Sequence, residues 1–420
     1  MKAPLEILNN GGALEIHMNQ KFLTGQAVIL AAGQSIRFWP LNRQHKGLFK
    51  ILGRPLIFYT IENLKKVGIR EIIIVQGPKK DIEKNLKTCP SPNRRFWWGV
   101  KYVIQDKPLG TGDALKRARN FVKERFLVLN GDDFYSVRDI KKCLKKKFCI
   151  LLKSIPNPQN FGQVLVQRDK VKKMVEKPKK EVSKLVNTGL YLLDKSIFDF
   201  KIKKSKRGEY ELTDFIKELI KRKKLDFKIA KDWIPISHPW DLFNINEFLL
   251  NKIKRKILGK VEKSVNLKGK IIVGEGTIIK SGTYIEGPVY IGKNCQIGPN
   301  CFVRKFTSIG DNCHIGQAVE IKNSIIGDNS KISHLSYLGD SIVGENCNLG
   351  AGTIFANLRF DEKIVKVKTQ GKIIDTGRKK LGAILGDNVK TGINVSLMPG
   401  VLVSPNSKIF SGSVLFKNFE

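Results

Sequence analysis

An aliphatic residue recurs at every sixth position of a long stretch in the second half of the chain: Val273, Ile279, Ile285, Ile291, Ile297, Val303, Ile309, Ile315 and Ile321. Neither an α-helix nor a flat strand has a period of six. Such a repeat indicates short strands joined by tight turns, in which each rung buries its apolar face only when neighbouring rungs stack on it. The same spacing resumes at Leu385, Thr391, Leu397, Val403, Ile409 and Leu415. We therefore expect residues 265–420 to form a parallel β-helix of hexapeptide repeats.

The residue four positions after each of these aliphatics is always short or β-branched: Thr277, Thr283, Val289, Cys295, Cys301, Thr307, Cys313 and Val319. We expect this position to lie at an inner corner that admits no large side chain. Glycines such as Gly274 and Gly292, which directly follow an aliphatic, are expected to provide the unrestricted backbone of a turn. The seven cysteines form no CxxC pair, and those within the hexads are interpreted as small core residues. Such cysteine usage is typical of a reducing cytoplasm.

The length of 420 residues favours two domains, because the hexapeptide region takes only about 150 of them. We expect one domain over 26–240, a connecting helix over 241–264 and the β-helix over 265–420. Residues 1–25 contain acids and glycines, do not resemble a secretion signal, and are expected to be a flexible extension. No apolar run approaches the length of about 20 residues that spans a bilayer. A cytoplasmic protein without membrane association is therefore expected.

The net charge of +38 is spread along the whole chain. Such a field attracts nucleotides, sugar phosphates, coenzyme A or, without specificity, RNA. A lysine-rich, solvated surface that reflects the host's composition explains the same charge equally well. Charge alone therefore names no partner, and we expect no specific binding of nucleic acid.

The first domain opens with a motif suited to phosphate binding. From Gln26 the sequence AVILAAG reads as a buried strand that ends at Gly33 in a loop of small residues, with Arg37 and Lys46 following. Such a loop offers backbone N–H groups to phosphate oxygens, and the two cations supply counter-charge. A later strand, FLVLN, ends at Asp132, where a carboxylate can hold Mg²⁺ against phosphate.

Between and after these motifs, strands and helices alternate. A helix from about Pro55 to Val67 is followed by the strands EIIIV and KYVIQ and then by a glycine turn that enters another helix. This order predicts an open α/β sheet of Rossmann-like type, with ligands at the carboxyl ends of its strands. Further polar motifs follow at Phe161-Gly162, Glu176-Lys177 and Asn187.

The motifs LAAG, Arg37, Lys46, QxxxLGTGDA, GDD, EKP, NTG, GEYELTD and PWDL, in this order, resemble those of the sugar-1-phosphate nucleotidylyltransferases. With the hexapeptide repeats, the chain resembles the bifunctional N-acetylglucosamine-1-phosphate uridylyltransferases that also acetylate glucosamine 1-phosphate, above all those of archaeal type. The resemblance covers about residues 26 to 418. It implies a nucleotidyltransferase domain followed by a left-handed β-helix of triangular cross-section, which forms homotrimers in this family.

For the first domain the resemblance implies transfer of UMP or dTMP from UTP or dTTP to a sugar 1-phosphate, with Mg²⁺ as cofactor and pyrophosphate as product. Positioning and charge neutralisation supply most of the catalysis in such a reaction. The implied catalytic residues are Arg37 and Lys46, and the implied metal ligands are Asp132 and Asp241. The nucleotide would be bound by Leu30, Gly33, Gln105, Gly110 and Thr111, and the sugar phosphate by Gly162, Glu176, Lys177 and Asn187.

Each of these residues also has a structural interpretation. Gly33 could end a strand, Gln105 and Thr111 could belong to a turn, and Asp132 could cap the next segment. Lys46 and Lys177 could be two solvated lysines among many. Only their joint order along the chain favours the functional interpretation of each one.

In the β-helix, Arg304 and Lys322 directly follow inward-facing aliphatics and lie 18 residues apart. If three hexads make one coil, the two side chains stack in adjacent coils at roughly 4.8 Å. Two cations this close repel each other unless an anion lies between them. The spacing therefore predicts an anion site, although two solvated bases remain an alternative.

His334 lies where the hexad phase slips, within the segment SHLSYLGD. A neutral imidazole can accept a proton from an amine that attacks a thioester. By the resemblance, His334 is the general base for acetyl transfer from acetyl-CoA to the amino sugar phosphate. Arg304 and Lys322 would hold its phosphate, and the remaining acceptor-binding residues would be Tyr337, Asn348, Asn357, Lys363 and Lys366. The hexads around Ala383 to Pro399 would face acetyl-CoA.

Three departures from the family pattern affect the phosphate loop. Ser35 stands where the family usually has a second glycine, Ile36 replaces a polar residue, and His45 replaces the proline before Lys46. A serine adds a β-carbon where the backbone approaches phosphate. Two further hypotheses therefore remain: a nucleotidyltransferase without acetyl transfer, and a non-catalytic, nucleotide-sensing subunit. The choices between UTP and dTTP, and between glucosamine and galactosamine 1-phosphate, also remain open.

Overall fold

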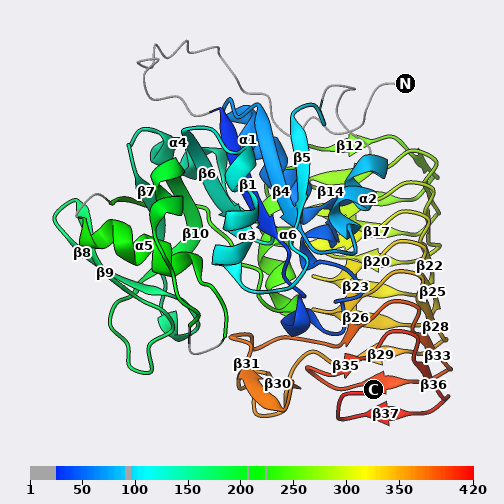
Figure 1. The fold of residues 1–420 in the computed structure, drawn as a ribbon. Coiled ribbons are helices and arrows are strands. Elements are labelled where there is room, and N and C mark those ends of the chain that lie inside the picture. The colour runs from blue at the N-terminus through cyan, green and yellow to red at the C-terminus, as the bar shows by residue number, and fades with distance from the viewer. Residues whose placement is uncertain (1–24, 90–95, 206–207, 223–224) are drawn as a thin grey trace.

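Figure 1 shows the computed structural model of the protein, an α/β domain seated along one side of a β-helix. The structure describes residues 25–89, 96–205, 208–222 and 225–420. The expected N-terminal extension therefore lies, except for its last residue, outside the described part. No helix in the described part is long and apolar enough to cross a bilayer.

The first domain is built on a nine-stranded sheet in the order β5-β4-β1-β6-β10-β7-β11-β9-β8. The strands are β1 (Gln26–Ala31), β4 (Glu71–Gln76), β5 (Val100–Ile104), β6 (Arg125–Asn130), β7 (Cys149–Ser154), β8 (Gln163–Gln167), β9 (Lys170–Val175), β10 (Leu185–Asp194) and β11 (Asp226–Ile229). β1 runs parallel to both β4 and β6, whereas β10 is antiparallel to β6. The expected open α/β sheet is confirmed, with a mixed half that the sequence motifs did not predict.

Helices cover both faces of this sheet, which is why its central strands are apolar throughout. Ala27 and Ile29 of β1 face the core beneath α1, α2 and α4, whereas Val28 and Leu30 face the core beneath α3 and α5. The covering helices are α1 (Leu56–Lys66), α2 (Asp81–Thr88), α3 (Thr111–Arg117), α4 (Val137–Leu144) and α5 (Leu212–Lys221). α6 (Leu242–Leu250) is buried instead in the core shared with the β-helix. A short hairpin of β2 (Lys50–Ile51) and β3 (Arg54–Pro55) precedes α1.

The second domain is a left-handed parallel β-helix with three sheets of eight strands. The first sheet holds β12 (Lys256–Ile257), β15 (Ile271–Val273), β18 (Val289–Ile291), β21 (Thr307–Ile309), β24 (Ile325–Ile326), β27 (Ile342–Val343), β32 (Ile384–Leu385) and β35 (Leu402–Val403). The second holds β13 (Lys260–Val261), β16 (Ile278–Ile279), β19 (Gln296–Ile297), β22 (His314–Gln317), β25 (Lys331–His334), β28 (Asn348–Leu349), β33 (Lys390–Thr391) and β36 (Lys408–Ile409). The third holds β14 (Asn266–Lys268), β17 (Tyr284–Glu286), β20 (Phe302–Val303), β23 (Glu320–Lys322), β26 (Tyr337–Gly339), β29 (Ile354–Phe355), β34 (Ser396–Leu397) and β37 (Val414–Leu415).

The hexapeptide pattern predicted the interior of this β-helix correctly. The periodic aliphatics from Val273 to Ile321 are all buried in one core, and so are the small residues at the corner position. The glycines that follow the aliphatics act differently from the expected turn residues. At Gly292, for example, a Cβ would lie 2.6 Å from the carbonyl carbon of Gly310 in the next coil, so close approach of the coils requires glycine there.

Among the residues with a Cβ, asparagine is the commonest at the turns of the β-helix that need a left-handed backbone. Asn294, Asn312, Asn329, Asn346 and Asn388 all have φ between 52° and 62°, which asparagine tolerates better than other residues with a Cβ. Their side chains also join neighbouring coils, as between Asn312 Nδ2 and Asn329 Oδ1 at 3.1 Å. The turns are therefore fixed by backbone conformation and by side-chain ladders together.

The expected connecting helix over 241–264 is wrong in its extent. α6 ends at Leu250, and the residues that follow it form β12 and β13 within the expected helix. These two strands pair with β15 and β16 of the following coil. The first coil thus begins before the regular hexads, because Ile257 and Val261 take inward or pairing positions without the full repeat around them.

A hairpin of β30 (Lys366–Thr369) and β31 (Lys372–Asp375) interrupts the coils between β29 and β32. Figure 1 shows this hairpin, in orange, projecting from the lower end of the β-helix beneath the α/β domain. Val365 and Val367 are each 1% exposed and belong to a core shared by the two domains. The hairpin is therefore held in place by the domain interface.

The same interface carries ion pairs around its apolar core. Lys50 Nζ lies 2.6 Å from Asp328 Oδ2 and 3.5 Å from Glu345 Oε1, and Arg43 lies 3.7 Å from Asp387. The carboxylates occupy turns of consecutive coils, so the β-helix presents a row of acids to the first domain. The apolar core and these ion pairs together fix how the domains sit on each other.

The small corner position gives a direct test of the coil geometry. Cys313→Leu should lower the midpoint of thermal unfolding, because the extra volume has no room beside the next coil; overpacking of this kind costs about 1–3 kcal/mol. Cys313→Val is the matched control, since valine already fills the equivalent position at Val289 and Val319, both buried. Equal midpoints for the two variants, measured by circular dichroism, would contradict a tight corner.

Candidate functional site

A cleft of about 630 Å³ opens at the carboxyl end of β1 in the first domain. Its volume is in the range of sites for small molecules. Every candidate residue of this domain except Asp241 lines it: Leu30, Gly33, Arg37, Lys46, Gln105, Gly110, Thr111, Asp132, Gly162, Glu176, Lys177 and Asn187. Residues scattered over 158 positions of sequence, from Leu30 to Asn187, therefore meet in one place.

The loop after β1 accommodates Ser35 in an unusual way. Ser35 has φ 55° and ψ 27°, a left-handed conformation that glycine adopts without strain. Its hydroxyl accepts a hydrogen bond of 2.9 Å from the backbone N–H of Lys46. The departure from glycine thus adds backbone strain but also ties the loop to the segment that carries Lys46. Ile36, beside it, is 56% exposed.

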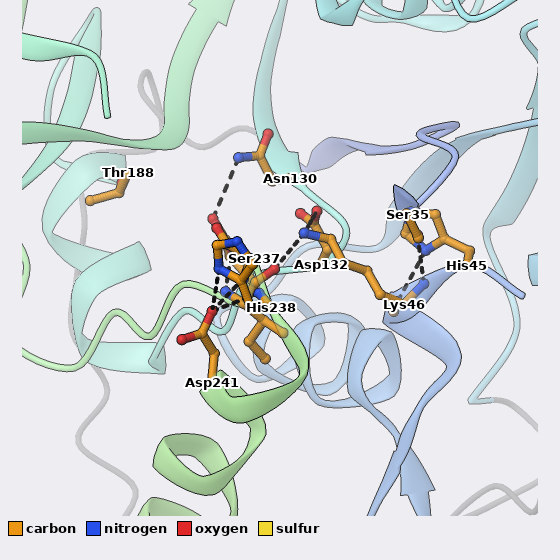
Figure 2. A network of polar contacts seen from close by, with 12 residues as sticks. Ser35, His45, Lys46, Asn130, Asp132, Thr188, Ser237, His238 and Asp241 are labelled. Atoms are coloured by element: carbon orange, nitrogen blue, oxygen red, sulfur yellow. Dashed lines mark hydrogen bonds and ion pairs between the residues drawn. The ribbon is translucent and has the colours of Figure 1, made fainter. Parts of the chain in front are cut away.

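Lys46 and Asp132 form the central contact of the cleft (Figure 2). Lys46 Nζ lies 2.6 Å from Asp132 Oδ2 and also donates to the backbone carbonyl of Ile236. Burial opposes ionisation of Asp132, but Lys46, His45 and the hydrogen bonds to the carboxylate together hold the pKa of Asp132 below its usual value. Asp132 is therefore a charged carboxylate with 24% of its side chain exposed toward the cleft.

Asp133 supports the contact between Lys46 and Asp132 through its own hydrogen bonds, a role that the sequence motifs did not indicate. Its Oδ1 accepts from the backbone N–H of Ile236 at 3.1 Å, and its Oδ2 accepts from Trp233 Nε1 at 3.3 Å. Desolvation and the adjacent Asp132 raise the pKa of Asp133 to about 7. Asp133 thus holds the segment at Ile236, whose backbone carbonyl accepts a hydrogen bond from Lys46.

Asp241 does not line the cleft. Its Oδ2 accepts hydrogen bonds of 2.8 Å from the backbone N–H groups of both Ser237 and His238, at the start of the short helix before α6. Desolvation raises the pKa of Asp241, although these hydrogen bonds oppose the shift. Figure 2 shows Asp241 grouped with Ser237 and His238 on the side of Asp132 away from Ser35.

The donor set suits a divalent cation that is completed by ligand oxygens. Asp132 offers a charged carboxylate at the cleft, and Asp241 lies nearby with only one oxygen taken by N–H groups. Nowhere in the described part do three or more acidic, histidine or cysteine side chains gather for metal binding. Mg²⁺ commonly uses one or two carboxylates together with phosphate oxygens and water. Asp132 and Asp241 therefore fit Mg²⁺ only with a phosphate bound.

On the opposite wall, Gln105 is held by the turn that leads into α3. Gln105 is 4% exposed, and its Nε2 donates to Gly110 O at 3.0 Å and to Asp113 Oδ2 at 2.9 Å. Gly110 has φ 102°, and a Cβ there would lie 2.5 Å from Tyr210 O, so only glycine fits. Thr111 Oγ1 accepts from the N–H of Leu212 at 3.0 Å. These partners orient the turn that borders the cleft.

The remaining candidates lie around β10. Asn187 Nδ2 donates to Tyr191 Oη at 2.5 Å, and Asn187 Oδ1 accepts from Gly189 N–H at 2.9 Å. A Cβ on Gly162 would lie 3.0 Å from Glu176 Oε2, so these two residues are close neighbours. Lys177 Nζ lies 4.0 Å from Glu176 Oε1. One acid, one base and one amide thus face the same part of the cleft.

A second group of candidates lies on the third sheet of the β-helix. Val303 pairs with Ile321, and the next residue, Arg304, donates its N–H to Ile321 O, so Arg304 and Lys322 follow in adjacent coils. Each cation has its own carboxylate: Arg304 lies 2.9 Å from Glu320, and Lys322 lies 3.3 Å from Asp340. Arg304 and Lys322 thus occupy equivalent positions of adjacent coils, as expected, but their charges do not require a bound anion, because the protein itself supplies a carboxylate to each.

Tyr337 and Asn357 belong to this group as well. Tyr337 pairs with Glu320 in the next coil, and Asn357 Nδ2 donates to Asp340 Oδ2 at 2.5 Å and to Tyr337 Oη at 3.5 Å. Asp340 is only 5% exposed and binds both Lys322 and Asn357. The sequence motifs missed Asp340, although its place in the segment SHLSYLGD was visible.

His334 and Asn348 lie on the neighbouring face, the second sheet. His334 ends β25 and is exposed, and Asn348 pairs with Lys331 at the start of the same strand. Within the described residues, the His334 side chain forms no hydrogen bond or ion pair with Arg304, Lys322 or Tyr337. The acetyl-transfer candidates of a single chain are thus divided between two faces that meet at the corner around Ser336.

Lys363 and Lys366 belong to the segment that interrupts the coils between β29 and β32. Lys363 follows a tight turn in which its N–H donates to Asp361 Oδ1 at 3.2 Å. Lys366 begins β30 and lines a different cavity together with Ile36 and Trp39 of the first domain, and Pro399 of the later hexads lines it too. In this chain, therefore, Lys366 is a neighbour of the phosphate loop.

Comparisons with known proteins agree with both domains. Residues 26–252 match the nucleotidyl transferase family, and residues 285–418 match the GMPPB C-terminal domain. The chain is 41% identical to the bifunctional protein GlmU of Methanocaldococcus jannaschii, over 94% of this chain and 95% of that one. It is 42% identical to the bifunctional sugar-1-phosphate nucleotidylyltransferase/acetyltransferase of Sulfurisphaera tokodaii, over 93% and 97%. The chain therefore belongs to the family of bifunctional sugar-1-phosphate nucleotidylyltransferases/acetyltransferases.

Proposed function

We propose that the protein catalyses two reactions of nucleotide-sugar synthesis: transfer of a nucleotidyl group to a sugar 1-phosphate in the first domain, and acetyl transfer to an amino-sugar 1-phosphate on the β-helix. The contact between Lys46 and Asp132 supports the first activity most strongly. It joins a cation suited to phosphate oxygens with a charged carboxylate suited to Mg²⁺, at the carboxyl end of a central strand. A UTP or dTTP donor fits the turn held by Gln105.

In the first reaction the protein mainly positions the two substrates and neutralises the charge of their phosphates. Lys46 and Arg37 would hold the triphosphate, with Arg37 exposed at the rim of the cleft and Lys46 at its base. Mg²⁺, held by Asp132 and Asp241, would neutralise phosphate charge. Asn187, Glu176 and Lys177 would orient the sugar phosphate so that its oxygen attacks the α-phosphorus in line and expels pyrophosphate. No covalent enzyme intermediate is needed.

For acetyl transfer, His334 would accept the proton of the attacking amine of the acceptor. Arg304 and Lys322 would hold the phosphate of that acceptor, with Glu320 and Asp340 keeping the two cations oriented until it binds. Acetyl-CoA would supply the acetyl group along the later hexads. The exposed imidazole of His334 supports this role, because a base must reach its substrate.

A second copy of the chain would complete this site in a homotrimer. The candidates of one chain lie on two faces of the β-helix, which suits a site shared between neighbouring subunits. Leu335, next to His334, is 63% exposed, and Phe410 and Phe416 near the end of the β-helix are 84% and 73% exposed. Large apolar side chains exposed in this way mark surfaces that another protein covers.

The two sites can be separated by substitution. Asp132→Asn should reduce pyrophosphate release from UTP or dTTP and a sugar 1-phosphate by roughly 10²-fold or more, because the carboxylate charge at the phosphates is lost. Release of thiol from acetyl-CoA with glucosamine 1-phosphate should continue. Asp169→Asn, in the exposed turn between β8 and β9, is the matched control. Parallel loss of both activities in Asp132→Asn would argue against two independent sites.

His334→Ala should reduce thiol release by about 10²- to 10⁴-fold, the usual contribution of a general base. Pyrophosphate release should remain. His314→Ala, one coil away on the same sheet, should retain both activities. If His334→Ala transferred acetyl groups at the rate of the unsubstituted protein, the base would have to be another residue.

Removal of Mg²⁺ with a chelator should affect nucleotidyl transfer but not acetyl transfer, and so distinguishes the two sites. Pyrophosphate release should stop and return when Mg²⁺ is added back, since the charge of the phosphates would otherwise be uncompensated. Thiol release should be unaffected, because no metal is assigned to the β-helix. Metal-independent pyrophosphate release would contradict the role of Asp132 and Asp241.

Ser35 allows a finer test of the phosphate loop. Ser35→Ala removes the acceptor of the Lys46 N–H but keeps a Cβ at φ 55°, so the KM for the nucleoside triphosphate should rise about three- to tenfold. Ser35→Gly also loses the acceptor but relieves the strain, so its KM should rise less. Steady-state rates of pyrophosphate release measure both. A larger defect in Ser35→Gly than in Ser35→Ala would show that strain is unimportant here.

A further inference from the structure

A second cavity adjoins the nucleotidyl-transfer cleft. It measures about 670 Å³, and it lies between the phosphate loop, the β30–β31 hairpin and the end of the chain. Ile36 and Gln370 line both this cavity and the cleft, so the two spaces meet at these side chains. We refer to it as the hairpin cavity. It brings residues of the β-helix domain to the border of the first active site.

The hairpin presents its lysines on one face. The burial of β30 alternates, with Lys366 and Lys368 exposed and Val367 and Thr369 buried, so both lysines lie on the face of the strand opposite the shared apolar core. Asn418 Nδ2 donates to Lys368 O at 2.7 Å and ties β30 to the segment after β37. These lysines therefore project from a fixed element.

The tip of the hairpin reaches the cleft itself. Gln370 and Gly371 have φ of 51° and 69°, two successive left-handed residues as in a tight two-residue hairpin turn. Glycine and asparagine are the usual residues there, whereas glutamine is strained. The strained residue, Gln370, is the hairpin residue that lines the cleft, and Ile36 is the other residue that borders both spaces.

The hairpin cavity is strongly basic. Lys366, Lys368 and Lys417 line it, and Glu420 is the only acid among the described residues that do so. None of the three ammonium groups forms an ion pair within the described part of the chain. Elsewhere many lysines do have such partners, for example Lys50 and Lys322. A cavity lined by unpaired cations attracts a multiply charged anion.

We propose that the hairpin cavity binds inorganic pyrophosphate and receives it from the nucleotidyl-transfer cleft, with Gln370 contacting it at the junction. This inference rests on the proposed nucleotidyl transfer, which generates pyrophosphate beside the phosphate loop. The β-helix domain thereby supplies product-binding residues to the first domain's reaction. Pyrophosphate would leave the cleft past Ile36 and Gln370, the two residues that line both spaces.

Direct binding of inorganic pyrophosphate to the full-length protein tests this site without relying on turnover. In isothermal titration calorimetry, the double variant Lys368→Met/Lys417→Met should bind pyrophosphate roughly tenfold more weakly, the effect of losing charge-assisted contacts. Lys372→Met, on the other strand of the hairpin and outside the cavity, is the matched control and should bind as the unsubstituted protein does. Equal affinity in the double variant and the control would overturn the proposal.

Product inhibition by pyrophosphate tests whether Gln370 contacts this anion. Gln370→Ala should raise the inhibition constant of pyrophosphate against the nucleoside triphosphate several-fold, and Gln370→Asn should restore part of it, since asparagine keeps the amide and tolerates the left-handed turn. Unchanged inhibition in Gln370→Ala would remove this residue from the site.

Coenzyme A is the alternative anion, because it also carries phosphates. If the double variant lost affinity for coenzyme A but not for pyrophosphate, the cavity would belong to acetyl transfer and the proposal would be wrong. Pyrophosphate release by the unsubstituted protein reports separately on nucleotidyl transfer, so failure of the binding site and failure of the proposed function give different results.

Discussion

The stacking of coils in the β-helix is the constraint on which the rest of the molecule depends. Each coil can approach the next only because glycine and small corner residues leave no side chain between them. This repetition carries equivalent residues of successive coils to the same face. It therefore builds both the row of Arg304, Lys322 and their counter-ions on one side and the row of acids that receives the first domain on another.

The row of acids at the domain interface also helps to hold the nucleotidyl-transfer site in place. The segment that bears Lys46 is fixed on both sides by contacts with the β-helix, through Arg43 to Asp387 and through Lys50 to Asp328. Burial raises the pKa of Glu345 despite the nearby Lys50, as expected for carboxylates crowded at an interface. The β-helix is thus part of the structure that holds the nucleotidyl-transfer lysine, in addition to carrying its own site.

The sequence predicted those features that depend on local order and repetition. The hexad period identified the buried residues of the coils, and the ordered motifs identified residues from Leu30 to Asn187 that meet in one cleft. It could not reveal Asp340 as the partner of Lys322 or Gln370 as a neighbour of the phosphate loop, because both depend on contacts between distant segments. The first coil was also missed, since its strands precede the full repeat.

The shared core of the two domains has a practical consequence for dissecting the enzyme. Phe38, Leu52 and Phe243, from the chain before the β-helix, are buried in the same core as Ile272 and Ile342 of the β-helix. A fragment ending after α6 would leave these side chains in water and would also lack the hairpin at the edge of its cleft. Such a fragment would be prone to aggregate and would misreport the kinetics of the intact enzyme, so each half is better silenced by point substitution than by truncation.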